Sequence, residues 1–204
     1  LESELFYSSH QVQKHHNHAM FQDLALLITA LSFPNFEFSQ RWLDLGLSRL
    51  EDQVSVLLAV QDGYAIFKEN SIGYHGGVIR LLSLANEIVS LFNNESIIHE
   101  VYDGMDKFMK LLTYPDGRSP AQGDTMRIPN EEEITRFSSS IKNQIICLEK
   151  PGYGVVKGHH DSKSFMFCFF ATALSKTHKH EDNLSFTLFF DMIEWLIDPS
   201  YYSH

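Results

Sequence analysis

The sequence predicts an α+β multidomain chain, with a helical domain over residues 1–140 and a β domain over residues 141–204. Three observations predict this class. The first two thirds repeat an amphipathic helix of about four turns followed by a short break. After Tyr114, turn-forming residues accumulate. From Gln144 onward, short apolar runs alternate with turns, as strands do.

Helices are expected where apolar residues recur at helical spacing, over residues 17–32, 38–60, 73–92 and 96–113. Pro34-Asn35, Asp62-Gly63 and Asn93-Asn94 separate them. In the second helix the apolar residues form one stripe, which we interpret as core: Trp42, Leu43, Leu45, Leu47, Leu50, Val54 and Leu58. Helix pairs of this kind stack into solenoids or close into toroids.

Pro115-Asp116-Gly117, Ser119-Pro120 and Gly123-Asp124 predict a linker or a functional loop, followed by a short charged helix over residues 131–137. Strands are then expected over residues 144–149, 153–157, 163–174, 184–190 and 193–197. Residues 158–161 are typical of a hairpin turn, and Asp191-Met192 is a weaker candidate. Cys147 and Cys168 have apolar neighbours, which favours packing inside over a disulfide framework.

Composition excludes some function classes. With 204 residues and 44% hydrophobic content the chain can bury a real core. Its formal charge of -10 argues against a nucleic-acid coat and a basic membrane-surface protein, and no apolar run is long enough to span a bilayer. An anionic substrate would need a local basic cleft. The candidate cluster comprises His10, Lys14, His15, His16 and His18; every member except His18 could equally belong to a solvated or weakly metal-binding surface.

The strongest candidate for a catalytic or metal-binding motif lies at residues 177–183, where His178, His180 and Asp182 occupy alternate positions just before an apolar run. If this segment enters a strand, side chains two apart share a face at roughly 7 Å, so the three would converge. Two further pairs, Asn17-His18 and Tyr74-His75, lie far upstream on helical patterns. A fold that brings the three groups together would form a proton-transfer centre.

Five motifs in this order resemble the heparinase II/III-like polysaccharide lyases. They are Asn17-His18, Asp62-Gly63, Glu69-Asn70-Ser71-Ile72-Gly73-Tyr74-His75, Gly123-Asp124, and the His178 to Asn183 segment with Asp198-Pro199. The resemblance covers nearly the whole chain. It implies part of an (α/α) toroid followed by the start of an antiparallel β-sandwich, because the family has more helices before Asn17 and more strands after Asp198. The chain would then be the central part of such an enzyme.

The implied activity is cleavage of a uronic-acid-containing polysaccharide by β-elimination. This reaction removes the proton α to a carboxylate, stabilises an enolate-like dianion and protonates the departing 4-oxygen. The resemblance assigns Asn17 to the carboxylate with His18 as helper or alternative base, Tyr74 as acid with a base role also open, and His178 as facing base. The simpler interpretations are that Asn17 is an N-cap and that Tyr74 packs at a helix start.

The resemblance also implies substrate contacts from Glu69, His75 and Asp124, and a structural zinc held by His180 and Asp198. The third zinc ligand of the family has no secure counterpart, and Asp198-Pro199-Ser200 replaces the more usual Asp-Pro-Gly. In the simpler alternative, His180 and Asp182 only hydrogen-bond at the mouth of the strand. No cofactor is expected to be required for the chemistry.

Two other functions compete with the lyase. One is a metal-dependent hydrolase in which His178, His180, Asp182 and Asp198 activate water. The other is a glycan-binding relative without catalysis. The expected partner is an acidic polysaccharide or oligosaccharide, with no nucleic acid and no membrane insertion; an oligomer stays open. The resemblance implies a bacterial periplasmic or secreted protein, a cytoplasmic location also being open. The identity of the uronate, its sulfation and endo or exo action are not encoded in these motifs.

Overall fold

The computed structural model describes residues 15–92, 96–125, 142–175 and 184–198. Its contacts group into two compact units, each described below by itself. The first unit comprises residues 1–58 and 78–102, and the second comprises residues 59–77 and 103–204. The predicted domain boundary near residue 140 and the predicted helix over residues 131–137 lie outside the described residues.

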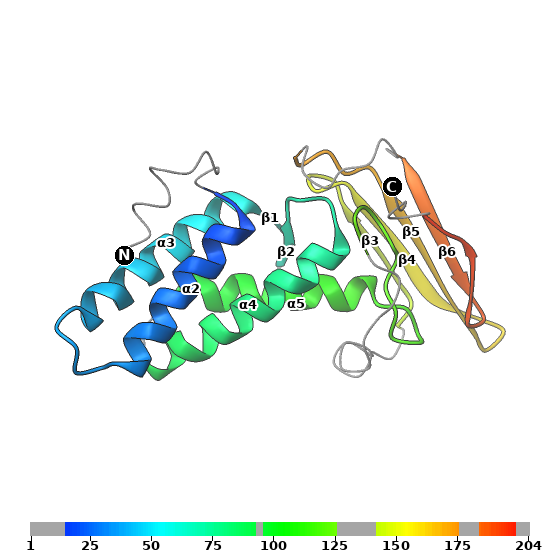
Figure 1. Cartoon of the computed structure of the whole chain (residues 1–204). Coiled ribbons are helices and arrows are strands. Elements are labelled where there is room, and N and C mark those ends of the chain that lie inside the picture. The colour runs from blue at the N-terminus through cyan, green and yellow to red at the C-terminus, as the bar shows by residue number, and fades with distance from the viewer. Residues whose placement is uncertain (1–14, 93–95, 126–141, 176–183, 199–204) are drawn as a thin grey trace. The chain divides into compact units, whose positions relative to one another are not determined.

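Four long helices, α2 (Asn17–Ser32), α3 (Ser39–Leu57), α4 (Ile72–Leu91) and α5 (Ile97–Leu112), confirm the four predicted from apolar spacing (Figure 1). In the first unit α2 and α3 pack against each other. A Cβ at Gly46 of α3 would lie 2.9 Å from the Asp23 carbonyl oxygen of α2, so only glycine permits this close approach.

The core of the first unit is formed by the apolar stripes that the sequence predicts. On α3, Leu43, Leu50 and Val54 are buried, which confirms the central part of the stripe. They lie in a unit whose other buried apolar residues come mainly from α2, from the part of α4 after Gly77 and from the start of α5: Ala19, Met20, Leu24, Leu27, Ala30, Val78, Ile79, Leu81, Leu82, Ala85, Ile88, Val89, Ile98 and Val101. Burial of these side chains, at roughly 25 cal/mol per Å² of apolar surface, stabilises the helix pairing.

A short hairpin, not the end of a helix, follows α3. Strands β1 (Leu58–Gln61) and β2 (Tyr64–Phe67) pair with each other. Asp62 and Gly63 both have positive φ, 53° and 73°, as the two central residues of a type I′ turn require. The predicted helix over residues 38–60 is therefore too long, because an Asp-Gly pair between apolar runs forms a hairpin here and α3 ends at Leu57.

The second unit contains a five-stranded antiparallel sheet whose strands follow chain order. The strands are β3 (Gln144–Leu148), β4 (Tyr153–His160), β5 (Lys163–Phe170), β6 (Ser185–Phe190) and β7 (Ile193–Leu196). Asp191-Met192 forms the predicted turn. The turn predicted at residues 158–161 lies later, at Asp161-Ser162, because His159 and His160 still pair with Ser164 and Lys163. β5 also stops at Phe170, earlier than predicted.

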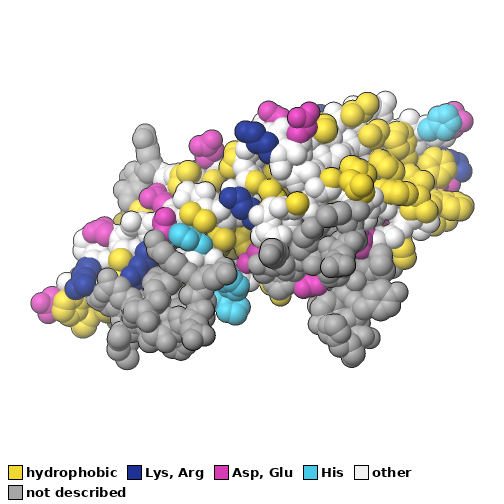
Figure 2. Space-filling view, turned by 90° about the horizontal axis from the view of Figure 1, so that it is seen from above, with side chains coloured by type: hydrophobic (Ala, Val, Ile, Leu, Met, Phe, Trp, Pro, Cys, Tyr) yellow, Lys and Arg dark blue, Asp and Glu magenta, His cyan; other side chains and the backbone are white. Residues whose placement is uncertain are grey.

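One set of sheet side chains is buried, namely Leu148, Tyr153, Val155, Lys157, Met166, Cys168, Phe170, Thr187 and Phe189. Exposed apolar side chains also gather over the sheet (Figure 2), among them Phe186 and Trp195, which are 46% and 63% exposed. The prediction that Cys147 packs inside is wrong, because its side chain is exposed on β3, which pairs only with β4 among the described strands.

The observed combination of helices with an antiparallel sheet confirms the α+β class. Among the described residues there is one five-stranded sheet beside the β1–β2 hairpin, so the toroid and the sandwich remain predictions. None of the described helices has the length and apolar composition needed to cross a bilayer.

A row of aromatic rings ties the start of α4 to the sheet within the second unit. The His75 ring contacts Phe108 of α5 edge-on, with centroids 5.0 Å apart. Phe108 contacts Tyr153 of β4 at 4.9 Å, and Tyr153 contacts Phe170 of β5 at 5.8 Å. Edge-to-face pairs of this kind contribute about 0.5–1.5 kcal/mol each beyond burial. The first turn of α4, which carries Tyr74, is therefore connected to β4 and β5 through Phe108.

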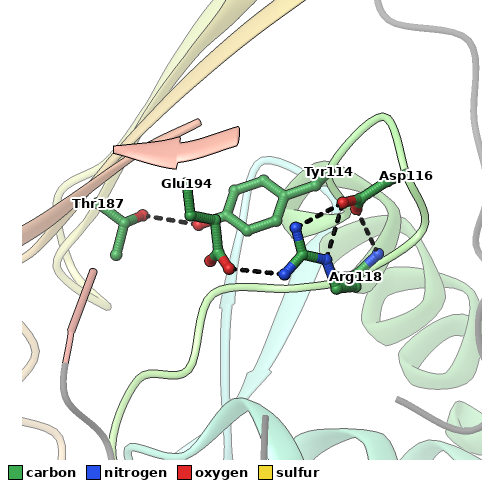
Figure 3. Close-up of polar contacts among 5 residues, drawn as sticks. All are labelled: Tyr114, Asp116, Arg118, Thr187 and Glu194. Atoms are coloured by element: carbon green, nitrogen blue, oxygen red, sulfur yellow. Dashed lines mark hydrogen bonds and ion pairs between the residues drawn. The ribbon is translucent and has the colours of Figure 1, made fainter. Parts of the chain in front are cut away.

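The connection after α5 is fixed to β6 and β7 (Figure 3). Tyr114 is fully buried; its hydroxyl donates to the Thr187 hydroxyl oxygen at 3.1 Å and its ring stacks on Phe189. Burial, more than any neighbouring group, raises the pKa of Tyr114. Arg118 joins Asp116 to Glu194 of β7, with a 2.8 Å contact to each carboxylate. These contacts hold the segment that leads to Gly123-Asp124 against the sheet.

Candidate functional site

The loop between β2 and α4 and the Gly123-Asp124 loop form one hydrogen-bonded unit. Ser71 caps α4, because its hydroxyl oxygen accepts from the Tyr74 backbone N–H at 3.3 Å. The Ser71 hydroxyl donates to the Asp124 carbonyl at 3.1 Å. Thr125 completes the junction: its hydroxyl oxygen accepts from the Gly73 N–H at 3.1 Å, and its hydroxyl donates to the Gln122 carbonyl. The structure therefore brings the predicted residues Tyr74 and Asp124 onto neighbouring segments.

Tyr74 lies on the first turn of α4 and is half-buried. The glycines on either side of this turn leave space around the helix. A Cβ added at Gly76 or Gly77 would meet no atom of the described residues within 4 Å, and Gly73 is exposed. As far as the described residues go, the backbone near Tyr74 is thus open to a ligand.

His75, by contrast, is only 2% exposed and both of its ring nitrogens are bonded to the backbone. Its Nδ1 accepts from the Phe67 N–H at 3.2 Å, and its Nε2 lies 3.1 Å from the Met105 carbonyl, to which it donates as the neutral tautomer. Burial lowers the pKa of His75 to about 4. The expected substrate contact does not fit this environment; His75 instead holds the start of α4 against β2 and α5.

This burial makes the stability of the fold depend on pH. His75 is neutral in the folded chain down to pH about 4 but becomes charged below its ordinary value of 6.5 once unfolded. The unfolded state therefore binds the extra proton, and stability is lost as pH falls from 6.5 toward 4. We expect His75 to account for a decrease of about 2 kcal/mol in the free energy of unfolding between pH 7 and pH 5.

Urea unfolding of the wild type and of His75→Gln at both pH values measures this effect. Other groups also titrate, so the test is the difference between the two proteins. His75→Gln is expected to be less stable at pH 7 but to lose clearly less stability at pH 5. Equal losses in both proteins would show that His75 is not the group responsible.

The other two predicted substrate-binding residues differ in exposure. Glu69 is 4% exposed, whereas Asp124 is half-buried. Asp124 therefore offers more side-chain surface to a ligand than Glu69 or His75. Glu69 lies in the same turn as Asn70, whose backbone has a positive φ of 55°, a conformation that Asn tolerates better than most residues.

Asn70 was not identified as a site residue from the sequence, yet it makes the most informative contact of the loop. Its side-chain Nδ2 donates to the carbonyl oxygen of Ser175 at 2.9 Å and to the Ser175 hydroxyl at 3.1 Å. Ser175 is the last described residue before the segment that contains His178. The loop that precedes Tyr74 is thus hydrogen-bonded to Ser175, three residues before His178 in the sequence.

Further hydrogen bonds hold the two ends of the connection between β5 and β6. The side-chain amide of Gln122 donates to the Thr172 hydroxyl at 3.1 Å, and its carbonyl oxygen accepts from the Tyr153 hydroxyl at 3.1 Å. At the other end, the Leu184 N–H donates to the Phe170 carbonyl at 2.9 Å, so the connection from β5 to β6 is closed at its base. His178, His180 and Asp182 lie outside the described residues, and their convergence stays a prediction.

The first unit presents Asn17 and His18 at the start of α2. The helix is capped by His16, whose side chain accepts from the His18 N–H, so Asn17 is the first helical residue and not the N-cap. The Asn17 Oδ1 also accepts from the His18 N–H, at 2.8 Å. Among the described residues no hydrogen bond uses the Asn17 Nδ2, which leaves amide donors for a carboxylate. His18 is exposed.

Two contacts with α3 hold this helix start. The His16 N–H donates to the Gln53 side chain at 3.2 Å, and the His15 Nε2 lies 2.9 Å from the Asp52 carboxylate. Of the predicted basic cluster, His15 and His16 are half-buried, and His10 and Lys14 lie outside the described residues. A carboxylate already accompanies His15, so His18 is the most accessible described member of the cluster.

Asp198 is 2% exposed and accepts from the Ser185 hydroxyl at 2.9 Å, next to the start of β6. Within the described ranges, no group of three His, Cys, Asp or Glu side chains is close enough to hold a metal ion. Its predicted zinc partner His180 lies outside those ranges. The described donors alone therefore do not form a zinc site, and zinc remains a prediction.

Solved structures named as lyases have a similar fold. The heparan sulfate lyase HepC from Pedobacter heparinus superposes with a TM-score of 0.74 at 20% identity, over 98% of this chain and 35% of that one. Heparinase III, the BT4657 gene product, gives a TM-score of 0.81 at 16% identity over 98% and 34% of the two chains. Another heparinase III structure gives 0.78 at 16% identity, over 96% and 36%.

At these identities the structural likeness shows the fold, and the chain spans about a third of the length of each solved lyase. No curated protein sequence matches it. Residues 4–143, however, match the family model described as the heparinase II/III N-terminus. This match takes in more than half of the chain, and the chain therefore belongs to the heparinase II/III family.

Proposed function

We propose that this chain is part of a polysaccharide lyase that cleaves a uronic-acid-containing acidic polysaccharide by β-elimination. The observation that supports it most is the pair of hydrogen bonds from Asn70 to Ser175, which join the loop of Tyr74 to the root of the His178 segment. Family membership and solved relatives named as a heparan sulfate lyase and heparinase III also support it. Such a polymer would be met in the periplasm or outside the cell.

In the proposed reaction the proton at C5 of the uronate passes to His178. The C4–O bond breaks as the C4–C5 double bond forms, and the departing 4-oxygen takes a proton from Tyr74. A tyrosine with an ordinary pKa near 10 keeps its proton at neutral pH and is a good donor, whereas an ordinary histidine pKa near 6.5 suits a base. The two roles therefore match the two side chains.

Asn17 is proposed to donate from its Nδ2 to the uronate carboxylate, where negative charge grows as C5 loses its proton. Its amide donors are not used by the described residues, and its carbonyl oxygen is held by the His18 N–H, so the amide would be oriented before substrate arrives. His18 is exposed beside it and is proposed as helper or alternative base.

The remaining predicted residues have supporting parts in this proposal. Asp124 is proposed to contact the sugar, since it is half-buried, and its backbone is bonded to Ser71. Glu69 and His75 are proposed to hold the loop. A zinc on His180 and Asp198 would act structurally, by joining the His178 segment to the end of β7, and no chemical step depends on it.

The direct test is the ultraviolet absorbance of the unsaturated uronate that β-elimination forms. The natural protein that carries these residues is offered heparan sulfate, alginate, hyaluronan and capsular polymers. We expect absorbance to rise with at least one polymer and to rise equally after treatment with a chelator, because Tyr74 and His178 carry the chemistry. Loss of the absorbance rise on chelation would contradict a metal-independent elimination. New reducing ends that form without any absorbance rise, and that stop forming on chelation, would favour the metal-dependent hydrolase, because hydrolysis creates no double bond. No rise with any polymer, when a known lyase responds, would contradict the proposal.

A further inference from the structure

A basic pocket lies in the second unit, on residues that the candidate site does not use. It has a volume of about 240 Å³ and is lined by Tyr64, Lys107, Lys110, Leu111, Lys142, Gln144 and Lys157. No Asp or Glu is among these described lining residues. Four lysines around one pocket stand out in a chain whose formal charge is -10.

Lys157 provides a fixed cation in this pocket. It lies on β4 and is 4% exposed. Its Nζ donates to the carbonyl oxygens of Lys110 and Leu111 at 3.1 and 3.0 Å, at the end of α5. An ammonium group has three N–H donors, and no described residue takes the third. One donor of a buried ammonium is thus left for a group inside the pocket.

The other lysines contribute charge from less buried positions. Lys107 donates to the Asp62 carbonyl at 3.1 Å and lies 4.1 Å from the centre of the Tyr64 ring. Lys142 is exposed. Among the described residues neither forms an ion pair, whereas Lys110 is paired with Asp106 at 2.6 Å. Three of the four ammonium groups therefore have no described carboxylate to neutralise them.

We propose that this pocket binds a tetrahedral oxyanion, a sulfate or phosphate group, with Lys157 as the fixed donor and Lys107 and Lys142 as the cations at its rim. Charge-assisted hydrogen bonds to oxyanions are stronger than neutral ones, and lysine is a common partner of such anions. Two carboxylates lie close by: Asp106 is paired with Lys110, and Asp62 is exposed and accepts from the Gln61 side chain at 3.1 Å. The pocket is larger than the ion, which leaves room for part of a sugar that carries a sulfate ester.

Isothermal titration of the protein with inorganic sulfate tests this proposal, with ionic strength held constant by chloride because exposed charges are screened by salt. Inorganic phosphate, glucosamine 6-sulfate and unsulfated glucosamine are titrated in parallel. We expect saturable one-to-one binding of the anions and none of glucosamine. Lys107→Gln and Lys142→Gln should each weaken binding roughly 5-fold, and the double variant roughly 20-fold or more.

The control is Lys150→Gln, which removes an exposed lysine of the same unit that does not line the pocket and should leave binding unchanged. The rim variants keep Lys157 in place, so the test does not depend on a variant that loses a buried bond. Tighter binding of glucosamine 6-sulfate than of free sulfate would support the proposal and identify the sulfate of a glycan as the source. Equal or tighter binding of the free ions would support it with a free oxyanion as ligand.

Absence of saturable binding for all three anions, or equal affinity in the double variant and the wild type, would overturn the proposal. The readout is binding and not cleavage. Failure to bind an oxyanion therefore does not contradict the proposed lyase activity. A failed lyase assay likewise does not contradict oxyanion binding in this pocket.

Discussion

Replacing Tyr74 with Phe is expected to lower the rate of polysaccharide cleavage by about 100- to 10,000-fold, while substrate affinity changes little. The substitution removes only the phenolic hydroxyl, which we propose donates a proton to the departing 4-oxygen, and positioned acids contribute a factor of this size. The ring stays on the first turn of α4, where Ser71 caps the helix through the backbone. Initial rates of the ultraviolet absorbance change, with kcat and KM determined separately, measure the effect.

Tyr102→Phe is the matched control, since Tyr102 is also a half-buried tyrosine on a long helix. It should keep a rate close to that of the wild type. If Tyr74→Phe kept it too, Tyr74 would not be the acid. Unchanged glycan affinity together with no cleavage by either the wild type or the variant would instead favour a glycan-binding relative without catalysis.

Gly152→Ala is expected to lower the free energy of unfolding by about 2–4 kcal/mol, a large fraction of the stability of an ordinary domain. Gly152 has a φ of +79°, and a Cβ there would lie 2.4 Å from the carbonyl oxygen of Ala171. The two residues cannot easily move apart, because the Ala171 N–H donates to the Gly152 carbonyl at 2.8 Å. Urea unfolding followed by circular dichroism measures the change.

Gly154→Ala, on β4 two positions after Gly152, separates this clash from a general cost of adding a methyl group. A Cβ at Gly154 would lie 3.5 Å from the Phe169 Cβ, which is ordinary contact, so we expect a change of less than about 1 kcal/mol. Similar losses for both variants would rule out the clash as the cause. Because Ala171 leads toward Ser175, Gly152→Ala should also reduce cleavage more than its loss of folded protein explains.

The four long helices could be predicted from the sequence because their evidence is local. Apolar spacing and the Pro34-Asn35 break act within one or two turns of the chain. The β1–β2 hairpin was missed because strands of four residues carry little periodicity, and Asp62-Gly63 is as typical of a helix break as of a tight turn. The turn at Asp161-Ser162 was predicted too early for a similar reason, since His159 and His160 show no alternation of apolar and polar residues that would mark them as strand.

The candidate site could be predicted only in part, because much of it depends on partners far along the chain. The motif at residues 69–75 identified Tyr74 as a candidate, and the structure bonds Ser71 of that motif to Asp124. The buried His75 ring is bonded to the Met105 carbonyl, 30 residues away, and Asn70 is bonded to Ser175, 105 residues away. No local pattern reveals such pairs. Cys147 shows the same limit, because an apolar neighbourhood does not reveal that a strand lies at a sheet edge.

The hydrogen bond between Leu184 and Phe170 has a consequence for how such proteins diversify. It closes the connection from β5 to β6 at its base, so the pairing of these strands is set by residues outside the connection. Lengthening a loop whose ends are already joined costs little entropy, about 0.6 kcal/mol for each doubling. Evolution, or a designer, can therefore lengthen the connection around His178 while the sheet keeps its alignment.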